Sequence, residues 1–161
     1  MRIAALCDIH GNLPALEAVL AELEADLVVV GGDVAAGPLP AETLDRLAEL
    51  DARYVMGNAD RLMVDAYDRG ADPATEESPV ARLDAWCAQR LTPEQRDRVA
   101  AYEPTVSAGG VLFCHGSPRS DEEIITAVSP EERLAPMFEG VAAHDGGLRH
   151  ALEHRRQPLL R

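Results

Sequence analysis

The chain begins MRIAALCDIHGN (residues 1–12), an apolar run that breaks into a cluster of polar residues and glycine. Residues 2–7 are predicted to form a short buried strand. Apolar side chains then recur at helical spacing over residues 13–25, which predicts an amphipathic helix. Asn12 stands where a helix N-cap belongs, and Pro14 falls in the first turn, where proline is tolerated. The chain therefore opens with a strand, a polar cluster and a helix.

The same order of elements repeats further along the chain. A second buried strand over residues 27–30 ends in GGD (residues 31–33), and a helix is predicted over residues 41–50. A third strand over residues 54–56 ends in GNAD (residues 57–60). Alternating strands and helices predict an α/β fold with parallel strands and right-handed crossovers. In such sheets the ligand site lies at the carboxyl ends of the strands, where these polar clusters fall.

The remainder of the chain is predicted to be helical at first and to include a hairpin. Residues 61–101 read as helices with breaks near residues 70–73 and 91–93. Strands over residues 105–107 and 111–114 are joined through glycines and predict a hairpin, which ends in HGSP at residues 115–118. A last helix is predicted from the capping pattern at Ser129 to about Phe138.

Composition limits the classes of function. The chain has 161 residues, enough for one domain, and a formal net charge of -13. That charge repels nucleic acid and anionic membranes, so neither is an expected partner. Cys7, Cys87 and Cys114 are too widely spaced for a disulfide framework and fit a reducing cytoplasm, and we expect Cys7 and Cys114 to be buried. The early acid at Asp8 argues against a signal peptide, and no apolar run is long enough to span a membrane.

Four strand ends carry side chains that bind metals. Asp8 and His10 are two residues apart, so they point to one side if the strand continues that far. Asp33 follows the second strand, Asn58 the third and His115 the second strand of the hairpin. Carboxylate, imidazole and amide groups together suit a borderline divalent metal. Taken singly, the Asp8 and His10 pair is as typical of a helix entry, Asp33 is a weak signal after a buried strand, and Asn58 is more typical of a turn. A lone histidine such as His115 is more often structural or exposed.

The combination is more specific than its parts. Independent turns rarely carry a metal ligand at every strand end. The segments CDIHGN (residues 7–12), GGDV (31–34), VMGNAD (55–60) and FCHGSP (113–118) follow one another in the order and spacing of a known family. On these motifs the chain resembles the calcineurin-like metallophosphoesterases, and in particular their small bacterial and archaeal phosphodiesterase branch. The resemblance runs from residue 1 to about residue 140.

This resemblance implies a β-sandwich flanked by helices and a two-metal hydrolase of a small phosphate ester. Asp8 and His10 would hold the first metal, Asp33 would bridge both, and Asn58 and His115 would hold the second. A hydroxide between the metals would attack phosphorus, so Asp33, Asn58 and His115 are also the expected catalytic residues. The ligands suit manganese, iron, zinc or nickel.

Candidates for contact with the substrate are weaker. Asn12 and Arg119 are the expected substrate-binding residues, and Arg61 is a further candidate for phosphate contact. Arg119 follows the HGSP segment and would lie near the site. A surface arginine with no such role is an equal alternative for Arg119.

The sequence departs from the family at two places. Ala59 stands where many members carry a histidine that assists the leaving group, although Asp60, which in those members helps to hold that histidine, is present. The family also ends its site with a strand and a Gly-His-x-His motif, which this sequence lacks. We therefore expect an incomplete metallophosphoesterase domain over residues 1–143 without its C-terminal strands, and an atypical tail over residues 144–161.

The tail carries three histidines, His144, His150 and His154, that do not follow a predicted strand. We do not assign them the family's ligand roles, and exposed tail residues are the simpler interpretation. One hypothesis for the tail is a reading-frame shift near residue 143, since a shifted frame permits a Val-rich strand there. The nucleotide sequence of the gene tests it.

Three functions remain open at this point. The first is hydrolysis of phosphomonoesters or phosphodiesters, weakened by the two departures. The second is a catalytically impaired remnant that still binds metal through Asp8, His10 and Asp33. The third is an interaction protein whose strand-end residues are caps and turns. Metal content separates the third from the others, and turnover separates the first from the second.

Overall fold

The computed structural model describes residues 1–141. Three short strands form a parallel sheet in the order β1-β2-β3, in which Ile3 pairs with Leu27 and Val28 with Ala52. The strands and the helices that join them are β1 (Ile3–Leu6), α1 (Leu13–Glu22), β2 (Leu27–Val30), α2 (Pro40–Ala48) and β3 (Ala52–Tyr54). This order confirms the predicted alternation of strand and helix.

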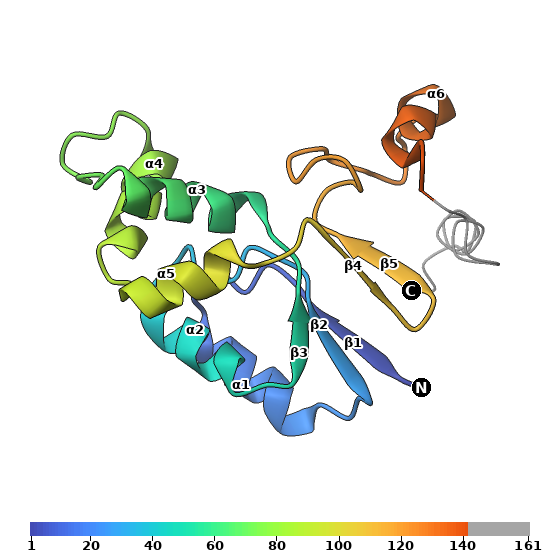
Figure 1. The fold of residues 1–161 in the computed structure, drawn as a ribbon, viewed down its shortest axis with the longest axis horizontal. Coiled ribbons are helices and arrows are strands. Elements are labelled where there is room, and N and C mark those ends of the chain that lie inside the picture. The colour runs from blue at the N-terminus through green and yellow to red at the C-terminus, as the bar shows by residue number, and fades with distance from the viewer. Residues whose placement is uncertain (142–161) are drawn as a thin grey trace.

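Helices and an antiparallel hairpin complete the described chain. These elements are α3 (Asn58–Asp68), α4 (Pro79–Ala88), α5 (Pro93–Ala100), β4 (Thr105–Ala108), β5 (Val111–Cys114), α6 (Glu131–Leu134) and the 3-10 helix η1 (Ala135–Phe138). The helices α1 to α5 lie on one side of the parallel sheet and the β4-β5 hairpin lies on the other (Figure 1). Within residues 1–141, no helix is both long and apolar enough to cross a membrane.

The parallel sheet has an apolar core on each face because its strands alternate. Val30 belongs to the larger core, which the helices cover and in which Leu44 and Leu47 are fully buried. Val29 points the other way and packs with Val55 and Val106 against the hairpin. The central strand β2 therefore has a buried side chain on each face, as expected for a parallel strand between two layers. This is the layered α/β arrangement that the sequence predicts.

Capping explains where several helices begin. The side chain of Asn12 accepts a hydrogen bond from the backbone N–H of Ala15 at 3.2 Å, which confirms it as the cap of α1. Thr92 and Gln95 form a reciprocal capping box at the start of α5. The prediction that Ser129 caps the last helix is wrong. Its hydroxyl accepts from the N–H of Thr126 instead, so α6 starts without a side-chain cap.

Two further expectations need correction. The sequence places the third strand over residues 54–56, but β3 ends at Tyr54, and Val55 instead forms an isolated parallel bridge with Glu103. Cys7, expected in the core, is exposed, while Cys114 is half-buried. Cys7 follows β1, which forms the edge of the three-stranded sheet in the described chain. Local hydrophobicity does not reveal that Cys7 follows an edge strand.

The larger core gives a test of the fold. Leu44→Ala removes a fully buried side chain from α2 and leaves a cavity, so we expect the free energy of unfolding to fall by about 2–5 kcal/mol. Leu83→Ala is the matched control, because Leu83 is 41% exposed on α4, and its cost is expected to be about 0.5 kcal/mol. Urea denaturation followed by circular dichroism measures both. Equal losses would contradict the described core.

Candidate metal centre

Three of the predicted metal ligands have strained backbones. Asp8, His10 and Asp33 have φ angles of 55°, 48° and 55°, and among residues 1–141 no other residue except glycine has a positive φ. A side chain in the left-handed region costs about 1–3 kcal/mol and persists only where the surroundings fix it. Strain of this kind is concentrated at functional sites. Here it falls on residues that the sequence singled out for their chemistry.

Backbone hydrogen bonds between the ends of β1 and β2 hold this conformation. The N–H of Asp8 donates to the carbonyl of Gly32 at 3.1 Å, and the N–H of His10 donates to that of Asp33 at 3.0 Å. The N–H of Gly11 donates to the carbonyl of Val34 at 2.8 Å. The two polar segments thus continue the pairing of the strands, which keeps their side chains together. The fold itself supports the strained turns.

The ligand side chains converge at the carboxyl ends of the strands. Asp8, Asp33 and His115 each offer a ligand atom, and these atoms lie within 4.8 Å of one another. His10 joins them, since its Nε2 lies 3.9 Å from Oδ1 of Asp8 and 3.8 Å from Oδ2 of Asp33. Nε2 of His115 lies 3.2 Å from Oδ1 of Asn58. The structure thus brings all five predicted metal ligands together.

Asp33 stands between the two histidines. Its Oδ2 is 3.8 Å from Nε2 of His10 and 3.5 Å from Nε2 of His115, so one carboxylate oxygen faces both imidazoles. The residue is only 6% exposed. A buried carboxylate carries a desolvation cost that a bound cation offsets. Asp33 therefore lies where the sequence analysis expects a shared ligand, between His10 and His115.

Both histidines are oriented by hydrogen bonds to backbone carbonyls. Nδ1 of His115 lies 3.0 Å from the carbonyl oxygen of Gly31, and Nδ1 of His10 lies 3.2 Å from that of Ala36. A carbonyl only accepts, so each Nδ1 carries the proton and donates. Each Nε2 then keeps its lone pair for the centre. This tautomer is typical of histidine ligands whose second nitrogen is fixed by the protein.

A buried carboxylate beneath the centre was not among the predicted site residues. Asp60 is fully buried and accepts hydrogen bonds from the backbone N–H groups of Asp33, Val34 and Gly57 at 2.7, 2.9 and 3.1 Å. Burial raises the pKa of Asp60 to about 6, and these N–H groups oppose the rise. All three of its partners are donors, and these favour the ionised carboxylate. The sequence signal for this role is an acidic residue in the first turn of α3, the helix that begins after Gly57.

A glycine allows α3 to approach Asp33 closely. A Cβ atom on Gly57 would lie 2.2 Å from Oδ1 of Asp33 and 2.3 Å from its backbone nitrogen. The absent side chain therefore lets the N-terminus of α3 reach the carboxylate, whose Oδ1 accepts from the N–H of Ala59 at 2.9 Å. Any larger residue would have to displace Asp33.

The predicted substrate contacts are occupied within the chain. The side chain of Asn12 caps α1 and is exposed next to the strand end. The guanidinium of Arg119 pairs with Glu123 and donates to the carbonyl of Pro136 at 3.1 Å. Arg61 pairs with Asp121 and Glu122. Their contact with a substrate stays a prediction: Oδ1 of Asn12 serves the cap, and both guanidinium groups are paired with carboxylates.

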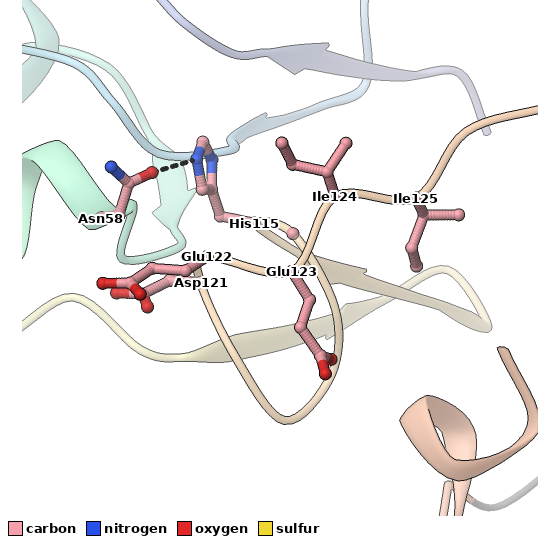
Figure 2. Close-up of a pocket in the computed structure, with 8 residues that line it drawn as sticks. Asn58, His115, Asp121, Glu122, Glu123, Ile124 and Ile125 are labelled. Carbon is pink, nitrogen blue, oxygen red and sulfur yellow. Dashed lines mark hydrogen bonds between the residues drawn. The ribbon is translucent and has the colours of Figure 1, made fainter. Parts of the chain in front are cut away.

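A pocket opens beside the centre and shares two of its residues. It encloses about 460 Å³ and is lined by Asn58 and His115 together with residues 116 and 121–125. Figure 2 shows Asn58 beside His115, with Oδ1 of Asn58 3.2 Å from Nε2 of His115, and the acidic segment of the loop after β5 close to them. The cavity therefore adjoins the ligands expected to hold the second metal.

The fold and this set of candidate ligands are those of a family of metal-dependent phosphoesterases. The sequence model of the calcineurin-like phosphoesterase family matches residues 1–154, and the chain belongs to this family. Its members are hydrolases that use divalent metals, in agreement with the oxygen and nitrogen ligands gathered around Asp33.

Two solved structures share the fold. A metallophosphoesterase from Sphaerobacter thermophilus is 31% identical with a TM-score of 0.66, over 86% of this chain and 55% of that one. The hypothetical protein PH1004 from Pyrococcus horikoshii OT3 is 19% identical with a TM-score of 0.67, over 85% of this chain and 64% of that one. The chain thus spans about half to two thirds of their lengths. A search of curated proteins returned no match.

The interpretation of the tail lies outside the described residues. This holds for His144, His150 and His154, for the boundary at residues 143 and 144, and for the reading-frame hypothesis. The family match itself continues to residue 154.

Gly57 provides a test of how the centre is built. We expect Gly57→Ala to weaken Mn²⁺ binding at least about tenfold, because the added Cβ displaces Asp33. Electron paramagnetic resonance of free Mn²⁺ measures the affinity. Gly110→Ala is the control for the steric effect, since a Cβ added at Gly110 would have no atom within 4 Å, although Gly110, unlike Gly57, has a positive φ. Unchanged affinity in Gly57→Ala would contradict the described contact.

Asp60 provides a test of the support beneath the centre. Asp60→Asn replaces one accepting oxygen with an NH₂ group that faces backbone donors, so we expect a loss of about 1–3 kcal/mol in the free energy of unfolding. Asp65→Asn makes the same change at an exposed position of the same helix and should be near neutral. Urea denaturation at pH 7.5 compares them. A neutral Asp60→Asn would refute this role.

Proposed function

We propose that the chain hydrolyses phosphomonoesters or phosphodiesters with the help of two divalent cations. The observation that carries the proposal is the shared position of Asp33, whose Oδ2 faces both histidines. Asp8, His10 and Asp33 would hold one cation, and Asp33, Asn58 and His115 would hold the other. Mixed oxygen and nitrogen ligands suit manganese, iron, zinc or nickel, and manganese is the ion we would supply first.

The chemistry of such a pair of cations is general. Two cations held this way lower the pKa of water, orient the phosphate and neutralise charge on the attacking and leaving oxygens. The protein supplies the geometry. The carbonyls of Gly31 and Ala36 fix the proton on Nδ1 of each histidine, and Asp60 holds the backbone of Asp33 in place. These contacts keep the ligands ready before substrate arrives.

Charge supports the need for cations at this site. The chain has a formal net charge of -13, and Arg61 and Arg119 are both paired with acidic side chains. A phosphate ester would be repelled by the protein alone and needs a local positive centre. A small phosphate ester is thus the proposed partner, in preference to nucleic acid. The free thiols of the three cysteines suit a reducing compartment, and the cytoplasm is the proposed site of action.

A second candidate function is metal binding with only slow hydrolysis of phosphate esters. Ala59 has no side chain able to protonate a leaving group, and its N–H already donates to Asp33. Loss of a general acid typically costs about 10²–10⁴-fold in rate. Good leaving groups need this help least. We therefore propose that esters with acidic alcohols, such as p-nitrophenyl esters, are hydrolysed best.

The test compares turnover with metal binding. With Mn²⁺ present, we expect the purified chain to hydrolyse bis(p-nitrophenyl) phosphate, and p-nitrophenyl phosphate in parallel distinguishes diesters from monoesters. Asp33→Asn should reduce turnover to background because it removes charge from the shared ligand, whereas Asp65→Asn should retain it. Mn²⁺ binding is measured on the same samples by electron paramagnetic resonance.

Each outcome has a separate meaning. Binding without turnover would identify the metal-binding protein of the second candidate. A folded chain that neither binds Mn²⁺ nor turns over either ester would defeat both candidates.

A further inference from the structure

Asp84 is a second buried acid, and unlike Asp60 it has no partner in the described part of the chain. It lies on α4 and is only 5% exposed. Within residues 1–141, its carboxylate accepts no hydrogen bond and forms no ion pair, whereas Asp60 accepts from three backbone donors. Burial of a carboxylate without a donor is destabilising. A compensating positive charge from outside the chain would remove this penalty.

The face of α4 that carries Asp84 adjoins the segment around His10. The helix packs along α3, as Figure 1 shows. One turn after Asp84, on the same buried face, the thiol of Cys87 donates to the carbonyl of Gly37 at 3.5 Å. Gly37 lies directly against His10, since a Cβ on Gly37 would be 1.8 Å from the carbonyl oxygen of His10. Asp84 is therefore one helical turn from the contact between α4 and the backbone beside the metal centre.

The charged groups around Asp84 leave it facing Asp33. Burial is the main cause that raises the pKa of Asp84, and the negative charge of Asp33 is the next. The other two charged groups that act on Asp84 are Arg69 and Glu76, which form an ion pair with each other. Their charges oppose one another at Asp84. The charge of Asp33, a predicted ligand of both cations, is thus the one that no nearby group offsets.

The carboxyl groups at and beside the centre have no strongly basic partner. None of the four pairs with an arginine or with the chain terminus within residues 1–141, and the two histidines of the centre are the bases that approach them. These four residues are Asp8, Asp33, Asp60 and Asp84. When ionised they carry four negative charges, which two divalent cations would balance.

We propose that Asp84 is a charge-balancing residue of the metal centre, whose carboxylate strengthens cation binding across space without contacting the cation. The inference rests on the cation site of the proposed function and adds a residue that is not among the ligands. It has a consequence that packing alone would not produce. The charge of Asp84 should destabilise the metal-free protein and at the same time favour the metal-bound protein.

The test measures both effects in one variant. Asp84→Asn removes the charge with little change of shape. We expect it to weaken Mn²⁺ binding about three- to tenfold, as measured by electron paramagnetic resonance of free Mn²⁺. In the metal-free protein, we expect the same variant to raise the midpoint of urea denaturation, because the buried group no longer carries a charge.

Two further variants separate charge from packing. Asp84→Leu also removes the charge but adds no NH₂ group, and it should weaken Mn²⁺ binding to a similar extent. Asp65→Asn makes the same change as Asp84→Asn at an exposed position of α3 and should alter neither quantity. Unchanged Mn²⁺ affinity in both Asp84 variants would overturn the proposal. A loss of stability together with affinity in Asp84→Asn would also overturn it, because that result would identify a residue that only supports the packing.

Turnover of the p-nitrophenyl esters keeps this inference apart from the function on which it rests. Turnover with equal Mn²⁺ affinity in the wild-type chain and Asp84→Asn would overturn the inference and leave the hydrolase in place. Opposite changes of affinity and stability in Asp84→Asn, without turnover by the wild-type chain, would retain the role of Asp84 and defeat the hydrolase. A folded wild-type chain that binds no Mn²⁺ would defeat the cation site and the role of Asp84 together.

Discussion

The buried carboxylate of Asp60 is the point at which the sheet, the third helix and the metal centre are joined. It accepts from two backbone N–H groups after β2 and from one at the start of α3. A buried acid is costly unless its oxygens are hydrogen-bonded, and here the partners are backbone groups that would otherwise lack an acceptor. These hydrogen bonds therefore satisfy the buried carboxylate and the backbone N–H groups together, and they fix the start of α3 relative to the end of β2.

The position of α3 in turn determines the second half of the site. The helix begins at Asn58, which places that amide beside His115, and it carries Arg61, which reaches the loop after β5. Gly57 permits the close approach because any side chain would collide with Asp33. The side chains proposed for the second metal, and the pocket beside them, are thus placed by the start of α3.

Much of the fold and the ligand set could be predicted because their signals are local. The strand ends at Asp8 and Asp33 follow apolar runs, and the cap at Asn12 stands just before its helix. The features that were missed depend on residues distant in sequence. The Arg61–Asp121 pair and the exposure of Cys7 are set by which segments pack together, and no local pattern encodes that.

The strained turns also bear on how the centre acquires metal. Asp8, His10 and Asp33 keep positive φ angles because backbone bonds such as that from His10 to Asp33 hold them, and these bonds involve no ligand atom. Folding of the sheet therefore already orders the ligand side chains. A cation that binds afterwards does not have to offset the entropy lost in ordering them. Metal affinity should then depend on contacts such as Gly57 with Asp33 more than on the ligands alone. The shape of the centre is thus set by the segments that follow β1 and β2, before any cation binds.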